Sequence, residues 1–124
     1  MSGFIARKAT ADAAGESWEF RRRGRKAQAT DRVGGVVGAY APIALGRGGR
    51  LRWGERDLEL KPVGKLWQEH YALLDGRSEL GRFRGKSWGS TPVRITLTDD
   101  AALEPGLLLF AAFVVRGLAE YAAQ

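Results

Sequence analysis

The chain has 124 residues, which is enough for one domain and too short for two domains of ordinary size. Hydrophobic residues make up 44% and charged residues 27%, which is typical of a folded globular chain and not of a disordered one. The net charge of +6 favours acidic partners, while the absence of cysteine and the single histidine exclude disulfides, thiol nucleophiles and metal sites that need such ligands.

The N-terminal part is predicted to hold an arm and the first two strands of one domain. Residues 1–15 are small and polar, so we expect a poorly ordered arm followed by a single domain over residues 16–124. Ser17–Arg22, SWEFRR, alternates aromatic and polar residues as a strand does. The charge run Arg21–Lys26 surrounds a turn, and Ala27–Arg32 is interpreted as the returning strand.

The middle of the chain is predicted to form further short strands. Val33–Leu45 is apolar but rich in Gly and Ala, which indicates a bulged strand or a close approach of backbone. Gly46–Gly49 is a turn. Leu51–Trp53 and Leu58–Leu60 then alternate apolar and charged residues on either side of a turn, which predicts a hairpin that ends at Pro62.

A second hairpin is predicted further along. In Leu66–Asp75, LWQEHYALLD, helical and strand periodicity compete, and the D-G pair at 75–76 favours a strand because this pair marks tight hairpin turns. Glu79–Arg84 returns, with a bulge expected at Gly81. Val93–Leu97 alternates cleanly and is the last of roughly seven or eight predicted strands.

The C-terminal segment is predicted to be one hydrophobic helix. Pro105 suits its first turn, and the helix is expected to run to about Ala123. Asp99 and Asp100 stand before it, where capping explains two carboxylates better than a metal or acid–base pair does. The stretch 107–115, LLLFAAFVV, is too short to span a bilayer, which needs about 20 apolar residues.

This helix determines the predicted fold class. Because 107–115 is apolar all round, we expect it to be enclosed, with Phe113 in the core. A flat sheet covers one side of a helix only. The sequence therefore predicts a mostly β fold, in which a curved or closed, barrel-like antiparallel sheet wraps around the hydrophobic C-terminal helix.

The order of features from Trp67 to Tyr121 resembles the tubby-like, LURP-one-related and phospholipid-scramblase-related group of domains. The resemblance lies in the Asp75-Gly76 hairpin, the Asp99-Asp100 helix entry and the apolar helix itself. It implies a β-barrel around a C-terminal helix. It also implies a role that is mostly non-enzymatic and an association with membrane lipids, often phosphoinositides.

Basic residues are the candidate binding groups, because clustered Lys and Arg bind phosphates of lipids or nucleic acids. A solvated turn is the competing interpretation of the same clusters. Trp88 joins them because it stands on a predicted loop beside a lysine, where an indole can contact a partner. The candidates are Arg21, Arg22, Arg23, Arg25 and Lys26 in one run, Arg47, Arg50 and Arg52 in a second, and Lys86 with Trp88.

No catalytic, metal or cofactor residue is predicted. His70 stands beside Glu69, but no nucleophile motif accompanies them, and a strand position explains this histidine better. Gly34-Gly35 matches no phosphate-loop pattern. We expect a non-enzymatic cytoplasmic domain, peripheral at anionic phospholipid surfaces. The alternatives are a nucleic-acid-binding module that uses Arg21–Lys26 and a structural or regulatory homo-oligomer.

Overall fold

A computed structural model describes residues 6–43, 48–63, 70–84, 94–97 and 103–122, which form nine strands and one helix. The strands are β1 (Ala6–Ala13), β2 (Glu16–Arg23), β3 (Lys26–Thr30), β4 (Val36–Pro42), β5 (Gly49–Trp53), β6 (Arg56–Pro62), β7 (His70–Asp75), β8 (Ser78–Arg84) and β9 (Arg94–Leu97), and helix α1 spans Pro105–Ala122.

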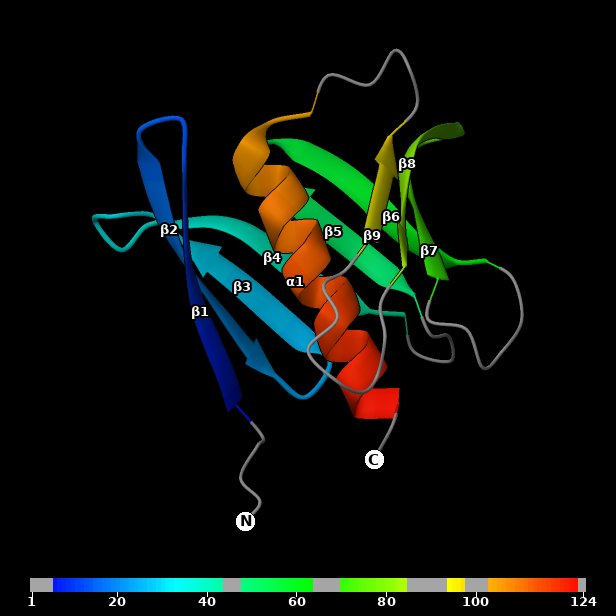
Figure 1. The fold of residues 1–124 in the computed structure, drawn as a ribbon, viewed down its shortest axis with the longest axis horizontal. Helices are drawn as coiled ribbons and strands as arrows, with labels where there is room; N and C mark the ends of the chain where they lie inside the picture. The colour runs from blue at the N-terminus through cyan, green and yellow to red at the C-terminus, as the bar shows by residue number, and fades with distance from the viewer. Residues whose placement is uncertain (1–5, 44–47, 64–69, 85–93, 98–102, 123–124) are drawn as a thin grey trace.

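The nine strands form one antiparallel sheet whose strand order is the order of the chain. Figure 1 shows α1 lying along the concave side of this sheet, with β1 and β2 on one side of it and β7 to β9 on the other. The prediction of a mostly β, antiparallel fold with a C-terminal helix is confirmed. Among the described residues no pairing joins β1 to β9, so the sheet is open and a closed barrel is not formed.

Alternation along each strand produces the two faces of the sheet. In β2 and β5 every second side chain is buried against the helix, and the residues between them point outward to solvent. Tight turns join the strands: Gly76, of the predicted D-G pair, has a φ of +63° in the β7–β8 turn. Regular two-residue turns keep the apolar set of successive strands on the same, inner face.

The core lies between the inner face and one side of α1. Trp18, Phe20 and Trp53 come from the sheet, and Phe110 comes from the helix. The ring centroids of Phe20 and Phe110 are 5.3 Å apart, and those of Trp53 and Phe110 are 5.9 Å apart. Trp18 and Trp53 fill the space between strands and helix, while Trp67 and Trp88 lie outside the described residues.

The helix is not enclosed on every side, contrary to the prediction from its composition. Its fully buried face follows helical spacing and consists of Leu107, Phe110, Ala111, Val114, Val115 and Leu118. Leu109 is 37% exposed, and Phe113 is half-buried against Phe20, with ring centroids 5.5 Å apart. An open sheet covers only one face of a helix. The apolar stretch 107–115 therefore did not require a closed sheet around it.

The predicted N-terminal arm is wrong for residues 6–13, because they form strand β1. All of them pair with β2, from Ala6 opposite Arg23 to Ala13 opposite Glu16. Ala11 and Ala13 pack against the core, while Lys8 points outward. Alanine alternating with polar residues satisfies strand periodicity as larger apolar residues do, and it was the small size of these side chains that suggested disorder.

Other predicted elements agree with the structure. Residues 70–75 form a strand, and the bulge expected at Gly81 lies one residue earlier, at Leu80, where the register between β7 and β8 shifts. The helix begins at Pro105 as predicted. The capping pair at 99–100 lies outside the described residues. Within the part of the chain that is described, no helix has the length and apolar character to cross a membrane.

Candidate functional site

Because successive strands are antiparallel, their connections alternate between two ends of the sheet. The basic end carries the β2–β3, β4–β5 and β6–β7 connections. The cleft end carries the β1–β2, β3–β4, β5–β6 and β7–β8 connections and the start of α1. Each end holds a different candidate site.

Strand alternation divides the arginine run at the basic end. Arg21 and Arg23 point to the outer face and are exposed, whereas Arg22 points inward and is 7% exposed. Its Nη1 donates a hydrogen bond to the carbonyl of Gly117 in α1, and a side chain at position 117 would collide with the Arg22 guanidinium. Arg22 therefore links the sheet to the helix. Because its side chain is buried, it is not available to a ligand, contrary to the prediction.

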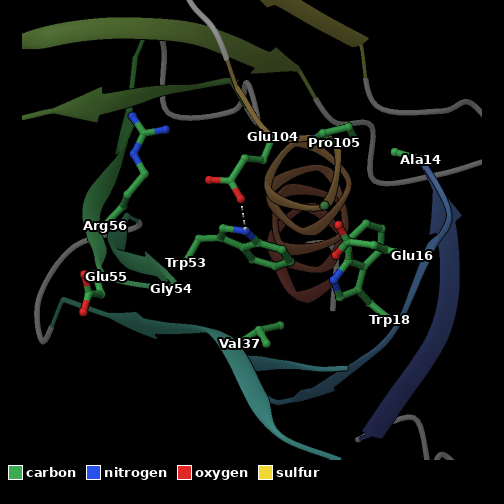
Figure 2. A pocket seen from close by; sticks show the side chains of 11 residues that line it. Ala14, Glu16, Trp18, Val37, Trp53, Gly54, Glu55, Arg56, Glu104 and Pro105 are labelled. Carbon is green, nitrogen blue, oxygen red and sulfur yellow. Dashed lines mark hydrogen bonds between the residues drawn. The ribbon is translucent and has the colours of Figure 1, made fainter. Parts of the chain in front are cut away.

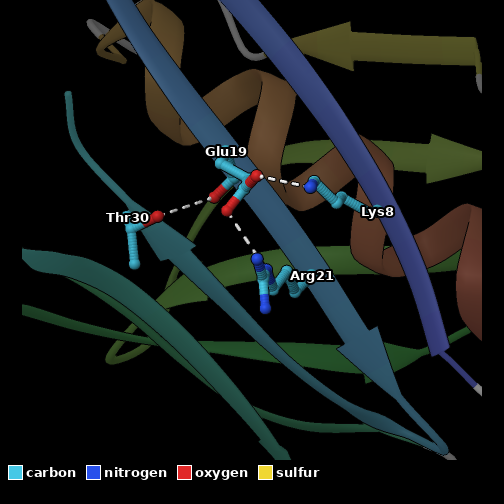
Figure 3. A network of polar contacts seen from close by, with 4 residues as sticks. All are labelled: Lys8, Glu19, Arg21 and Thr30. Atoms are coloured by element: carbon cyan, nitrogen blue, oxygen red, sulfur yellow. Dashed lines mark hydrogen bonds and ion pairs between the residues drawn. The ribbon is translucent and has the colours of Figure 1, made fainter. Parts of the chain in front are cut away.

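The outer face of β1 to β3 contains a small ionic network around Glu19 (Figure 3). Lys8 Nζ lies 3.1 Å from Glu19 Oε2, and Arg21 Nε lies 3.1 Å from Oε1. The hydrogen bond from Lys8, together with the charge of Arg21, lowers the pKa of the Glu19 carboxyl. Glu19 thus offsets part of the positive charge of Lys8 and Arg21.

Next to this network, the register brings the two predicted arginine clusters together in one cross-strand row, which we call the basic row: Arg23, Lys26 and Arg50. Arg23 lies directly opposite Lys26, and Arg50 lies opposite Ala41. The pairing of Ala27 with Tyr40 places Lys26 beside Ala41, so Lys26 and Arg50 are two strand spacings apart, roughly 10 Å. All three side chains are exposed. Glu59 of β6 lies opposite Arg50, but no salt bridge within the described part of the chain joins an acidic side chain to any of the three.

The remaining basic candidates contribute less to this surface. Arg52 lies in the adjacent row and its Nε is 3.3 Å from Asp57 Oδ1. Arg25 is half-buried in the β2–β3 turn. Its charge acts on the hydroxyl of Tyr40, whose pKa is nevertheless raised by burial. Arg47, Lys86 and Trp88 lie outside the described residues.

The basic end also presents an apolar side chain that the sequence had not singled out. Ile43 follows the end of β4, is 44% exposed, and its backbone N–H donates to the Gly48 carbonyl at 3.0 Å. It lies beside the strand ends that carry Lys26 and Arg50. No pattern in Val33–Leu45 separates the exposed Val33, Val36 and Ile43 from the buried Tyr40, because burial here depends on where β4 begins and ends.

At the opposite end, a cleft of about 380 Å³ opens between the turns of the sheet and the first turn of α1 (Figure 2). This volume lies within the range of small-molecule sites. The lining residues are Ala14, Glu16, Trp18, Val37, Trp53, Gly54, Glu55, Arg56, Glu104, Pro105 and Gly106.

Two indoles that meet at a steep angle form the apolar wall of the cleft. The ring centroids of Trp18 and Trp53 are 6.0 Å apart and the ring planes are inclined by 63°. Trp53 Nε1 donates to Glu104 Oε2 at 3.2 Å. A Cβ at Gly106 would come within 2.5 Å of Trp53 and 2.7 Å of Trp18, so the absence of a side chain there lets the helix start against both rings.

The polar part of the lining is predominantly acidic. Glu16, Glu55 and Glu104 are exposed at the rim. The cationic group in the lining, Arg56, has its Nη2 3.3 Å from Asp75 Oδ2. No group of carboxylates or histidines in the described residues is close enough together to hold a metal ion.

The cleft was not predictable from the sequence, because each of its residues has a simpler explanation there. From the sequence alone, solvent exposure explains a glutamate in the Gly54-Glu55 turn, and a place in the core explains a tryptophan on a strand. A signal was present in both turns, where a tryptophan lies within three residues of a Gly and a Glu: Gly15-Glu16 before Trp18, and Gly54-Glu55 after Trp53. Only the register of nonadjacent strands brings these two turns to one place.

His70 occupies a strand position, as predicted. It is half-buried at the start of β7, opposite Arg84 on β8. Partial burial, together with the charges of Arg84 and Arg82, lowers the pKa of its imidazole. Glu69 lies outside the described residues.

The protein is thus an open antiparallel sheet with a C-terminal helix on its concave side. It has a basic end and, at the opposite end, an acidic cleft lined by two indoles. No protein-family model matches the chain, and no curated protein or solved structure is similar enough to count as a match. The resemblance to the tubby-like and scramblase-related group therefore stays a prediction.

Proposed function

We propose that this chain is a non-enzymatic binding domain whose basic end docks onto anionic phospholipid surfaces. The observation that carries the proposal is the basic row. Arg23 and Lys26 are like charges directly opposite each other, an arrangement that costs stability in a sheet unless an anion lies between them. Arg50 extends the row across β5.

Two features of the same end favour a lipid surface over a nucleic acid. Ile43 offers an exposed apolar group beside the cations, and basic plus apolar groups together are what binds a protein to a bilayer interface. Stacking platforms for single-stranded nucleic acid need exposed aromatic rings. Among the described residues, the aromatic side chains of the sheet point to the inner face.

The expected strength of this docking is modest and depends on salt. Each Lys or Arg near an anionic bilayer contributes about 1 kcal/mol, so the three cations of the basic row contribute about 3 kcal/mol. The contribution decreases when salt screens the exposed charges. The domain would therefore associate reversibly.

The first testable prediction compares two double variants of equal charge. Arg23→Gln/Arg50→Gln removes two cations from the basic end, and Arg32→Gln/Arg77→Gln removes two exposed cations from the cleft end. We expect the first variant to bind phosphatidylserine-containing vesicles roughly 30-fold more weakly than the unchanged chain. The second variant should bind nearly as well as the unchanged chain. Co-sedimentation at low salt, with phosphatidylcholine vesicles as the neutral reference, measures both.

The alternatives make different predictions in the same assay. Equal loss of binding in both variants would mean that net charge alone drives association, and absence of binding by the unchanged chain would remove the lipid proposal. Tighter binding to RNA or duplex DNA than to vesicles, with a steep dependence on log salt, would favour the nucleic-acid alternative. A stable oligomer without vesicle binding would favour the structural alternative.

A further inference from the structure

We propose that the cleft at the start of α1 is a binding site for an organic cation with a quaternary ammonium group. The cleft lies at the opposite end of the sheet from the basic row, so this site is independent of lipid docking. The shape of the cleft, its two indoles and the placement of its carboxylates point to this ligand.

The indole walls favour a positively charged, apolar head group. The face of a Trp ring attracts cations, and sites for quaternary ammonium groups are built from aromatic walls inclined to each other. Trp18 and Trp53, with ring planes inclined by 63°, line the cleft with the small part of each ring that the core leaves exposed, 7% and 6%. Ala14, Val37 and Pro105 complete an apolar lining that methyl groups can contact (Figure 2).

The carboxylates determine the sign of the ligand charge. Glu16, Glu55 and Glu104 contribute three negative charges to the lining, whereas Arg56 is directed to Asp75. Glu104 also stands at the N-terminal end of α1, where its charge offsets the partial positive charge of the first helical turn. The carboxylates would repel an anionic ligand. The start of the helix would attract it only weakly, because Glu104 already offsets the partial positive charge there.

The spacing of the carboxylates excludes a bare metal ion as the intended occupant. No set of acidic side chains in the described part of the chain is close enough to coordinate one ion. A bulky cation fits this geometry, because its charge is spread over methyl groups and needs no close ligand shell. The cleft volume of about 380 Å³ leaves room for such a group.

The hydrogen bonding of the cleft favours a quaternary over a primary ammonium. A primary ammonium has three N–H donors that lose water on binding and need acceptors. One oxygen of Glu104 already accepts from Trp53 Nε1, and the carboxylates of Glu16 and Glu55 stand at the rim and not on the indole wall, which itself has no acceptor. A trimethylammonium group has no N–H donor and avoids this cost.

The test uses the full chain and the indole N–H signals of Trp18 and Trp53 in proton–nitrogen NMR spectra. We expect choline and Nα-acetyl-trimethyllysine amide to shift both signals. Tighter binding of choline would identify a free metabolite as the ligand, and tighter binding of the trimethyllysine amide would identify a modified protein side chain. Ethanolamine should bind more weakly than choline. The neutral isostere 3,3-dimethylbutan-1-ol should bind more weakly as well.

Matched variants test the carboxylates without touching the core. Glu16→Gln/Glu55→Gln changes two exposed side chains at the rim and should weaken choline binding roughly threefold to tenfold. Glu19→Gln/Glu59→Gln removes the same charge from the outer faces of β2 and β6, away from the cleft, and should leave choline binding unchanged. The spectra themselves report that each variant is folded.

Three results would overturn the proposal. They are the absence of a shift at both indoles, equal binding of choline and its neutral isostere, and equal weakening by the two double variants. The proposal for the basic end would survive each of them, because vesicle binding uses residues that these variants do not change.

Discussion

At the scale of single residues, position in the strand decides the role of each arginine in the 21–26 run. Arg22 points into the core and bonds to the helix at Gly117, whereas its neighbour Arg23 points to solvent in the basic row. The sequence predicts a cluster of cations but not its division, because the division follows from the register of β2. The pairings of β3 with β4 and of β4 with β5 place Arg50 in the same row as Arg23, which the sequence could not reveal.

The second prediction follows from this division. Arg22→Ala should lower the free energy of unfolding by about 1–3 kcal/mol, because it removes a buried charged hydrogen bond and leaves the Gly117 carbonyl and the space around it without the guanidinium. Arg23→Ala should change it by about 0.5 kcal/mol or less. Urea unfolding of both variants measures the difference, and equal effects would contradict the assignment of Arg22.

The third prediction concerns His70, the single histidine of the chain. Because its pKa is lowered in the fold from 6.5, protonation costs more in the folded chain than in the unfolded one. Stability is therefore full above the unfolded pKa and decreases as the pH falls below it toward the folded pKa. The decrease is expected between about pH 7.5 and about pH 5.5, because this is the range in which a histidine side chain ordinarily titrates.

His70→Gln should accordingly flatten the dependence of stability on pH in that window. Urea unfolding at several pH values, with the unchanged chain beside the variant, measures the slope. An unchanged slope in the variant would show that another group is responsible.

At the scale of elements, the hairpins and the helix were predictable from the sequence, but the extent to which the sheet encloses the helix was not. The D-G turn, the clean alternation in β9 and the proline at the helix start are local signals, and each agreed with the structure. Strand β1 was missed because its inward side chains are alanines. Sheet closure depends on whether β1 meets β9, and no local pattern carries that information.

The fourth prediction compares two phenylalanines of α1. Phe110 is fully buried, so Phe110→Ala should cost about 3–5 kcal/mol of stability. Phe113 is half-buried, so Phe113→Ala should cost about half as much, and not the full amount expected for an enclosed helix. Thermal or urea unfolding measures both, and equal costs would mean that Phe113 is covered as completely as Phe110.

At the scale of the whole molecule, charge is divided between the two ends of the sheet. The basic end carries Arg23, Arg25, Lys26, Arg50, Lys61 and Arg84. The cleft end carries Asp12, Glu16, Asp31, Glu55, Asp57, Asp75 and Glu104, with Arg32, Arg56 and Arg77 among them. Such a division orients a molecule as it approaches an anionic surface, with the cleft directed away from that surface.

The fifth prediction follows from this separation. Vesicles of phosphatidylserine, which contain no choline, should leave the choline affinity of the bound protein within about twofold of its value in solution, because distant sites act independently. NMR of choline in the presence of vesicle-bound protein measures this affinity. A large loss would mean that the bilayer covers the cleft and that the docking orientation is wrong.

The order of the strands also bears on how the protein is made. Each strand can pair with the one before it as the chain leaves the ribosome, but the rings of Trp53 and Phe20 meet Phe110 only after α1 has been synthesised. Translation adds residues in fractions of a second, much more slowly than hairpins form. The inner face of the nascent sheet therefore stays exposed to solvent until the helix is available. During this interval a chaperone can bind its apolar side chains.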